Sequence, residues 1–332
     1  MRVLVTGATG FLGANLVHHL VRRGDTVRVL TRPSSSMALL DGVPVEVAVG
    51  DVADVGSLVA AARGVEAIYH AAALVSYWRR WRERQYLVNV DGVRNVIEAA
   101  VRTGVRRVVH TSSIATIGYR ADGVPADEDT EWNWGPADIA YFTTKHLGEG
   151  EALKGLERGV DVVIVNPAII FGARDVGWKA GRIFKLIDER STQLLPAALA
   201  TTCDVDDVCE GHIAAMERGR SGERYILGGA TVSLADLFRL AAEIMGRPVR
   251  VITVPYPLAV AAAWVVERLS IVTRKEPPFA PESLRAARKS FPYDSTKAIR
   301  ELGYPQTPLH ASLEKAYRWY REQGLLPPRG RD

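Results

Sequence analysis

Short runs of consecutive apolar residues alternate along the first half of the chain with longer segments in which apolar residues recur every three or four positions. A short apolar run predicts a strand buried on both faces, and the longer repeat predicts a helix with one buried face. Strands that alternate with helices are typical of a parallel sheet covered on both sides, the doubly wound α/β fold. The predicted strands are residues 2–6, 26–31, 45–49, 67–70, 107–111 and 160–166. The predicted helices between them are residues 11–23, 55–63, 89–103 and 138–156.

The pattern becomes less regular after residue 167, where prolines and glycines are frequent and apolar runs are short. Residues 203–208 and 225–227 are predicted to return to the main sheet, and residues 234–245 and 309–323 to form amphipathic helices. Residues 275–281 are predicted to be a proline-rich loop. We therefore expect a dinucleotide-binding domain and a smaller substrate-binding lobe. The domain comprises residues 1–170 with 201–228 returning to it, and the lobe comprises residues 171–200 and 229–332.

Residues 257–266, with the sequence PLAVAAAWVV, form a continuous apolar run. The run is too short to span a bilayer, and Glu267 and Arg268 end it. We expect a buried or half-buried helix here. The two alternatives are a peripheral contact with a membrane and the wall of an apolar substrate tunnel.

The composition is that of a soluble globular enzyme, with 332 residues of which 47% are hydrophobic and 24% charged. The net charge is +4, and the basic residues are scattered among acidic ones, so nucleic acid is not an expected partner. Cys203 and Cys209 are the only cysteines, and they fit neither a zinc site nor a disulfide framework. We expect no metal, no signal peptide and a location in the reducing cytoplasm.

The N-terminal sequence MRVLVTGATGFLG places Gly7, Gly10 and Gly13 between the first predicted strand and the first predicted helix. A glycine at such a turn allows the chain to reverse tightly and lets the backbone approach a ligand closely. The N-terminus of the following helix offers free N–H groups and a partial positive charge to phosphates. The sequence therefore predicts a dinucleotide site at this turn.

A second motif lies on the helix predicted at residues 138–156. Tyr141 and Lys145 are four residues apart, so their side chains share one face of the helix. Ser112 and Ser113 follow the strand at residues 107–111, at the edge where parallel sheets build their sites.

With the glycine turn, these motifs resemble the extended short-chain dehydrogenase/reductase family, also called the NAD-dependent epimerase/dehydratase family. Further matching pieces, in the order typical of the family, are Gly50-Asp51, residues 71–73, residues 89–92, Asn166-Pro167 and residues 205–208. The stretches HTSSIATIG and VVIVNPAIIFGARD are most similar to the dihydroflavonol-4-reductase-like and hopanoid-associated sugar epimerase-like branch.

The resemblance implies that Ser113, Tyr141 and Lys145 are catalytic. Tyr141 would exchange a proton with a substrate hydroxyl or carbonyl. The Lys145 ammonium and an oxidised nicotinamide would both favour the phenolate, and Lys145 would hold the nicotinamide ribose. Ser113 would orient the substrate oxygen, with Ser112 as the alternative.

The resemblance also implies a cofactor site. Asn89 is either a helix cap or a functional residue. The loop after the second strand contains Arg32 and no acid, which favours NADP(H), with NAD(H) as the alternative. The residues expected at the cofactor are Gly7, Thr9, Gly10, Phe11, Leu12, Gly13, Arg32, Asp51, Val52, Ala71, Ala72, Ala73, Tyr141, Lys145, Asn166 and Pro167.

The aromatic loop after the fourth strand, residues 76–81, is the predicted substrate loop and suggests an apolar substrate surface. Residues 132–134 either form the opposite side of that surface or are anchored in the core. We predict hydride transfer between a nicotinamide cofactor and a carbonyl or secondary alcohol, preferably aromatic or alicyclic. The alternatives are a sugar-nucleotide epimerase or dehydratase with tightly bound NAD, and a dinucleotide-binding regulator. A homodimer through the catalytic helices is expected from the family. The residues expected at the substrate are Ser76, Tyr77, Trp78, Ser113 and Phe171.

Overall fold

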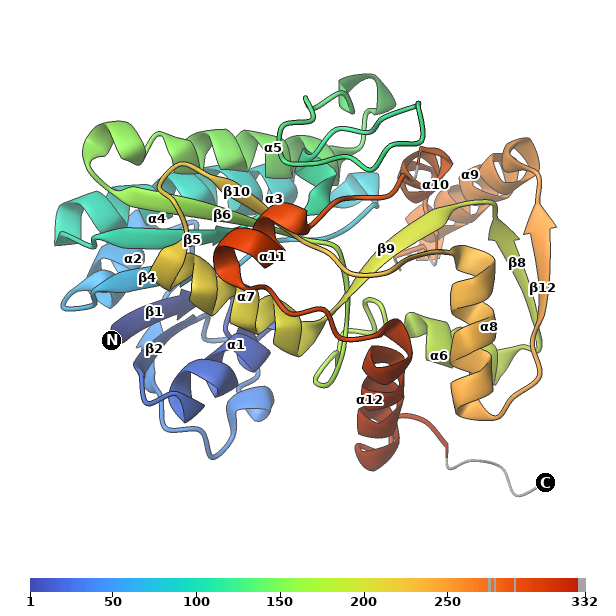
Figure 1. The fold of residues 1–332 in the computed structure, drawn as a ribbon, viewed down its shortest axis with the longest axis horizontal. Helices are drawn as coiled ribbons and strands as arrows, with labels where there is room; N and C mark the ends of the chain where they lie inside the picture. The colour runs from blue at the N-terminus through green and yellow to red at the C-terminus, as the bar shows by residue number, and fades with distance from the viewer. Residues whose placement is uncertain (274–275, 278, 290, 328–332) are drawn as a thin grey trace.

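The computed structural model of the chain describes residues 1–273, 276–277, 279–289 and 291–327. Its centre is a seven-stranded sheet in the order β10-β6-β5-β4-β1-β2-β3, with every neighbouring pair parallel. This confirms the predicted doubly wound fold (Figure 1). The strands are β1 (Arg2–Thr6), β2 (Thr26–Thr31), β3 (Glu46–Val49), β4 (Ala67–His70), β5 (Arg107–Thr111), β6 (Asp161–Pro167) and β10 (Arg224–Leu227).

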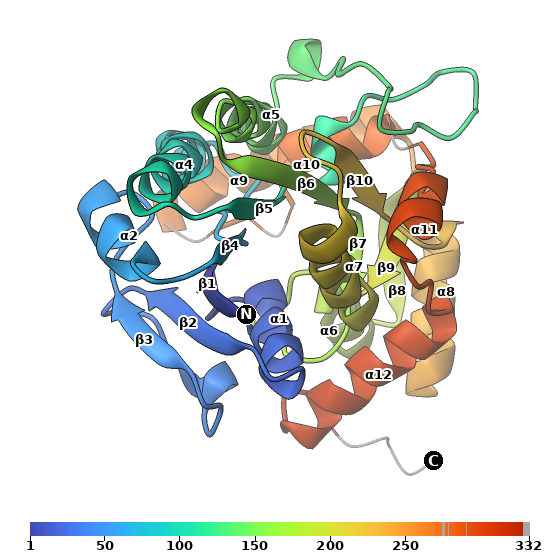
Figure 2. The same ribbon diagram turned by 60° about the vertical axis from the view of Figure 1, so that its left-hand side comes forward.

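Helices cover both faces of this sheet, as its continuously apolar strands require. On one face α1 (Phe11–Arg22) packs beside α7 (Val205–Arg218), and their apolar residues join those of the strands in one core cluster. On the other face α2 (Val55–Ala62), α4 (Gly92–Thr103) and α5 (Ala140–Leu153) lie side by side (Figure 2). A short helix α3 (Arg82–Tyr86) and a π-helical turn (Leu87–Asp91) precede α4.

The prediction that residues 203–208 form a strand of the main sheet is wrong. Strand β9 (Leu199–Asp204) pairs with β7 (Ile169–Phe171) and β11 (Thr231–Ser233) in a separate three-stranded sheet. The Asp204 side chain accepts a hydrogen bond from the Asp206 N–H, which caps α7 and ends the strand. The prediction for residues 225–227 is confirmed, because β10 pairs with β6 at the edge of the main sheet.

The remaining segments build a smaller lobe around an apolar cluster of its own. The helix predicted at residues 234–245 is confirmed as α8 (Leu234–Met245). The helix predicted at residues 309–323 is α12 (Leu309–Glu322), which ends one residue earlier. The residues at which the chain divides into domain and lobe stay a prediction. The lobe contains α6 (Arg182–Glu189), β8 (Thr192–Pro196), α8 (Leu234–Met245), β12 (Arg250–Val254), α9 (Tyr256–Thr273), α10 (Pro281–Arg288) and α12 (Leu309–Glu322), with α11 (Thr296–Leu302) packed on α7.

The helix expected at residues 257–266 is present as part of α9, and it is half-buried, with one side exposed. Within α9 the Leu258 and Val265 side chains are 63% and 61% exposed, whereas Ala263 is fully buried. The predicted loop at 275–281 falls partly outside the described residues, and Pro281 begins α10. Over the described ranges, no helix has both the length and the apolar character needed to cross a membrane.

The glycine turn between β1 and α1 is closely packed. Gly7 has a φ of +70°, and a Cβ atom added to it would lie 2.6 Å from the backbone nitrogen of Ala72. A Cβ atom on Gly13 would lie 2.2 Å from the carbonyl oxygen of Gly7. The tight reversal expected at this turn is therefore present at Gly7, and Gly13 is closely packed against it.

Replacing Gly13 with Ala is expected to lower the free energy of unfolding by roughly 1–3 kcal/mol, because the added methyl group has no room beside the Gly7 carbonyl. Gly150 is a matched control, since it lies in α5, is exposed and has nothing within 4 Å of an added Cβ atom. Gly150→Ala is expected to raise stability by up to about 1 kcal/mol. Equal effects of the two substitutions in urea unfolding would contradict the packing argument.

Candidate functional site

The structure brings Ser113, Tyr141 and Lys145 together at the carboxyl edge of the sheet. Tyr141 and Lys145 lie one turn apart on α5, and Ser113 follows the end of β5. The Lys145 Nζ donates a 2.7 Å hydrogen bond to the carbonyl oxygen of Thr111, the last residue of β5. The Ser113 side chain lies close enough to the Tyr141 hydroxyl to lower the pKa of that hydroxyl.

The two candidate serines differ in what they contact. Ser113 Oγ also accepts a 3.2 Å hydrogen bond from the Ala115 N–H, which leaves the hydroxyl oriented beside Tyr141. Ser112 is buried, and its hydroxyl points to Thr116 Oγ1 at 3.4 Å. The geometry therefore favours Ser113 over Ser112 as the partner of Tyr141.

The glycine turn lies at the same edge of the sheet. Thr6, at the end of β1, is paired with His70 of β4, which is paired in turn with His110 of β5. The Ala71 and Ala72 backbone rests against Gly7, so position 7 has no room for a side chain. Helix α1 begins at Phe11 with no side-chain cap and no acid in its first turn. A glycine cradle and an uncapped helix N-terminus fit the pyrophosphate of a dinucleotide.

Lys145 is a buried cation, with only 2% of its surface exposed. Burial lowers its pKa to about 8, and the nearby Glu149 carboxylate acts in the opposite direction. Burial also raises the pKa of Tyr141, while the nearby Ser113 side chain lowers it. In the protein alone desolvation of the phenolate is the larger effect on Tyr141, and the expectation that Lys145 and an oxidised nicotinamide together favour the phenolate stays a prediction.

Glu149 is a buried carboxylate beside the candidate site that was not predicted from the sequence. It is 4% exposed and lies on the same face of α5, four residues after Lys145. Its Oε1 accepts hydrogen bonds from Thr116 Oγ1 at 2.6 Å and from Asn166 Nδ2 at 2.7 Å. Its Oε2 pairs with Arg224 at 3.2 Å. The regular spacing of Tyr141, Lys145 and Glu149 along α5 is the signal that could have revealed it.

The Glu149 network also reaches the backbone of Ser113. Asn166 Nδ2 donates to the Ser113 carbonyl oxygen at 3.2 Å, and Thr116 Oγ1, which shares its single proton with the Glu149 carboxylate, lies 2.8 Å from the same oxygen. Asn166 is fully buried in this network, and the next residue, Pro167, ends β6. These contacts give Asn166 a structural role, and its contact with the cofactor stays a prediction.

Three buried histidines lie beneath Lys145 and the strand ends. Burial lowers the pKa of His70 to about 3 and that of His212 to about 4, and it places the pKa of His110 well below its usual value. The His70 and His110 rings stack with centroids 5.3 Å apart, and Thr6 and Thr111 hydroxyls bond His70 and His212. Near neutral pH these rings are uncharged, so they add no positive charge next to Lys145.

Asn89 is not a helix cap. It lies in the π-helical turn, and its side chain bonds both the N–H and the carbonyl oxygen of Leu74, at 2.8 and 3.1 Å. Its amide also donates to Thr144 Oγ1 at 3.1 Å. Asn89 therefore connects α5 to the start of the predicted substrate loop, and the cap alternative is wrong.

The substrate loop places an aromatic ring beside Tyr141. The Tyr77 ring lies 6.0 Å from that of Tyr141 and 6.4 Å from that of Phe142. Trp134 is 3% exposed and packs against Phe142 at 4.9 Å, so it is anchored in the core. Phe171 is 2% exposed in the core of the lobe, which accounts for it without substrate contact.

Within the same loop, Ser76 and Trp78 are both 5% exposed. Ser76 Oγ accepts from the Trp78 N–H at 3.1 Å and bonds Glu276 at 2.5 Å. Contact of these two residues with substrate stays a prediction.

The predicted adenosine side of the site is formed by the ends of β2 and β3. The Asp51 carboxylate accepts a 3.0 Å hydrogen bond from the Ala53 N–H, and Val52 packs into the core beneath it. Arg32 is exposed, and none of the carboxylates in the described ranges pairs with its guanidinium. Arg32 is therefore available to an anionic ligand.

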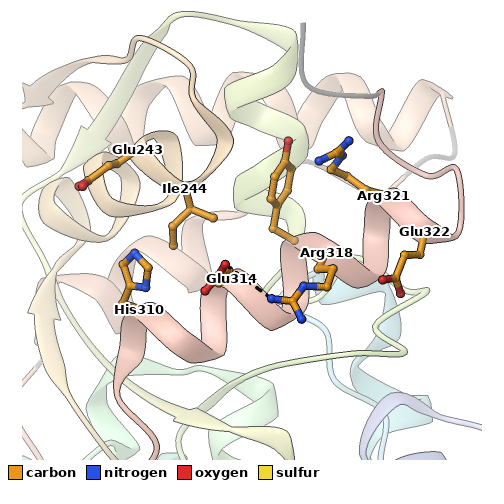
Figure 3. A pocket seen from close by; sticks show the side chains of 8 residues that line it. Glu243, Ile244, His310, Glu314, Arg318, Arg321 and Glu322 are labelled. Atoms are coloured by element: carbon orange, nitrogen blue, oxygen red, sulfur yellow. Dashed lines mark ion pairs between the residues drawn. The ribbon is translucent and has the colours of Figure 1, made fainter.

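A separate hollow of about 580 Å³ opens between α8 and α12 (Figure 3). It contains charges of both signs, and Glu314 pairs with Arg318 across its floor. The residues of the predicted site do not line it, so the hollow is not the candidate site. Its lining residues are Glu243, Ile244, His310, Glu314, Tyr317, Arg318, Arg321 and Glu322.

The NAD-dependent epimerase/dehydratase family model matches residues 3–228, and the chain belongs to this family. It is an enzyme of that family, whose chemistry is NAD(P)-dependent oxidoreduction.

Three relatives match over nearly their whole length. A putative dihydroflavonol 4-reductase of Synechocystis is 37% identical over 97% of this chain and 95% of the relative. Sterol demethylase protein B of Methylococcus capsulatus is 36% identical over 98% of this chain and 100% of the relative. The 4-hydroxy-2-methyl-3-oxo-4-farnesyl-3,4-dihydroquinoline-1-oxide ketoreductase of Stigmatella aurantiaca is 32% identical over 99% of this chain and 100% of the relative.

Solved structures show the same fold over the whole chain. The crystal structure of gox2253 superposes with a TM-score of 0.86 at 34% identity, covering 98% of this chain and 99% of the other. The dTDP-glucose 4,6-dehydratase DesIV of Streptomyces venezuelae, solved with NAD and TYD bound, has a TM-score of 0.79 at 25% identity. The match covers 99% of this chain and 100% of the other.

Replacing Lys145 with Met is expected to stabilise the ligand-free protein by roughly 2 kcal/mol near neutral pH, because the variant has no buried ammonium to desolvate. The folded pKa of about 8 lies below the value of about 10 in an unfolded chain. The unfolded wild type therefore binds more protons between these pH values, and its stability rises with pH across that range. The difference in free energy of unfolding between Lys145→Met and the wild type, measured by urea titration, should therefore shrink as the pH rises across that range. A difference that does not change with pH would contradict the argument.

Proposed function

We propose that this protein reduces an aromatic or alicyclic carbonyl compound with NADP(H), and oxidises the corresponding secondary alcohol in the reverse direction. The observation that carries the proposal is the placement of Tyr141 and Ser113 beside buried Lys145, at the sheet edge that also holds the glycine turn.

In the proposed mechanism Tyr141 donates a proton to the carbonyl oxygen, and Ser113 donates a hydrogen bond that orients the same oxygen. Burial favours the neutral phenol of Tyr141, which is the form needed to donate that proton. Lys145 would hold the ribose hydroxyls of the cofactor, and the N–H groups at the start of α1 would hold its pyrophosphate. When bound, the nicotinamide supplies or accepts the hydride.

The substrate class is supported by the apolar surroundings of Tyr141. Tyr77, Phe142 and Trp134 form a cluster of aromatic rings around it, which suits a flat apolar compound better than a sugar. Two of the relatives have names that refer to a sterol and to a farnesylated quinoline oxide. Both names are consistent with a lipophilic ring-containing substrate.

Tyr141→Phe is expected to lower kcat for ketone reduction by about 10²–10⁴-fold, because it removes the proton donor. A panel of cyclic and aromatic ketones, followed by nicotinamide absorbance, measures this effect, and fluorescence titration shows whether the cofactor still binds. Tyr119→Phe is the matched control, because Tyr119 packs on Trp134 but does not touch the reacting groups. Turnover by Tyr141→Phe at the wild-type rate would remove Tyr141 from the mechanism.

Arg32→Ala is expected to lower kcat/KM for NADPH by about 10–100-fold and to leave that for NADH nearly unchanged. The reason is the loss of a charge-assisted hydrogen bond to the ribose 2′-phosphate. Arg190, exposed at the end of α6, provides a control substitution away from the predicted site. A wild-type enzyme that prefers NADH would refute the NADP(H) assignment.

The second candidate is a sugar-nucleotide epimerase or dehydratase that keeps NAD bound through the catalytic cycle. The superposition with DesIV favours it. Cofactor that co-purifies with the protein, together with conversion of a nucleotide sugar without net change in nicotinamide absorbance, would identify this alternative. Net oxidation of NADPH by a ketone would exclude it as the main activity.

A further inference from the structure

Among its described side chains, helix α9 exposes several large apolar ones and buries two polar ones. Leu258, Val265 and Leu269 are 63%, 61% and 60% exposed. Glu267 and Ser270 are each 6% exposed on the inner side. A helix that faces water normally shows the opposite arrangement. The outer side of α9 is therefore shaped for contact with something less polar than water.

The exposed residues form a continuous stripe. Leu258, Ala262, Val265 and Leu269 are three or four positions apart, so they lie along one face of the helix. Trp264, at 41% exposure, flanks that stripe.

The strand pair that leads into α9 continues the apolar character at the same end of the molecule (Figure 1). Ile252 of β12 is paired with Leu194 of β8, and these side chains are 38% and 66% exposed. Their neighbours Val251 and Leu195 pack into the lobe, so Ile252 and Leu194 occupy the outer face of this sheet.

We propose that the outer face of α9 is a docking surface for an anionic phospholipid bilayer, on which the helix lies parallel to the membrane plane. Aliphatic residues with a flanking tryptophan are typical of helices that lie in the interface between lipid chains and headgroups. The inner side of α9 packs on α10, which keeps the helix attached to the protein rather than inserted across the bilayer.

Charge favours a bilayer over a second copy of the chain. Arg268 is exposed next to the stripe, and exposed Arg288 lies 4.9 Å over the ring of Tyr256 at the start of α9. Among the described side chains of α9 the one carboxylate, that of Glu267, is turned inward. A symmetric dimer through this face would bring two basic patches together, whereas anionic headgroups would neutralise them.

The docking surface is joined to the predicted substrate loop. Ser76 Oγ and the Glu276 carboxylate, which follows α9 in the chain, are hydrogen-bonded at 2.5 Å. Arg285 of α10 donates to the carbonyl oxygen of Asp138, just before the catalytic helix. Docking would therefore hold the substrate loop near the lipid, where a lipophilic carbonyl compound would accumulate; this consequence rests on the proposed function.

The test is flotation of the full chain with two kinds of vesicle, one of phosphatidylcholine and one of equal parts phosphatidylcholine and phosphatidylglycerol. We expect binding to the anionic vesicles, weaker binding at high salt and weaker binding to the neutral ones. The double variant Val265→Ser/Leu269→Ser is expected to lose about tenfold or more in vesicle partitioning. Val47→Ser/Val49→Ser is the matched control, because these residues are 53% and 65% exposed on β3, at the opposite edge of the main sheet.

Thermal unfolding of all variants shows whether the fold is kept, and sedimentation equilibrium gives the mass of each. Absence of binding to anionic vesicles, or equal binding by the wild type and the folded α9 variant, would overturn the proposal. A dimer that the α9 variant breaks would also overturn it and assign this face to a second copy, whereas the dimer expected through the catalytic helices would be unaffected. Flotation requires no turnover, so its outcome is independent of the assigned reaction.

Discussion

The burial of the Lys145 ammonium is the constraint on which the rest of the site depends. A buried cation is unfavourable unless polar groups replace its lost hydration. Here the carbonyl oxygen of Thr111 and the carboxylate of Glu149 replace part of that hydration, and the pKa of Lys145 is still lowered to about 8. The neighbouring histidines are uncharged near neutral pH because they are buried, and they add no repulsion. A cation held in this way can bind an electron-rich group of a ligand.

The position of α5 is defined from both parts of the chain. Asn166 of β6 and Arg224 of β10 hold Glu149 from the side of the main sheet. From the lobe, the buried carboxylate of Glu282 accepts a 3.0 Å hydrogen bond from the N–H of Ala140, at the first turn of the helix. An acceptor at that position satisfies an N–H group that has no partner within the helix. The site therefore requires the lobe as well as the sheet.

The same lobe exposes the outer face of α9. Polar and apolar side chains are therefore distributed differently around α5 and on α9. Around α5 buried polar groups are paired, and they order the site. On α9 apolar groups remain in contact with water although Glu267 and Ser270 are buried, which is unfavourable for an isolated protein in solution. Stability of the folded chain therefore does not explain the composition of this helix, and contact with a partner surface does.

The six strands predicted from the first half of the chain, and the helices between them, lie within three residues of their predicted bounds, because local periodicity determines which side of an element is apolar. Local spacing was also sufficient to place Tyr141 and Lys145 on one face. The sequence did not determine that Asn89 holds Leu74, or that residues 203–208 end a small sheet and begin α7. Nor did it determine that α10 reaches the start of α5. Those contacts join residues far apart in the chain, and only the packing of the complete tertiary structure decides which faces meet.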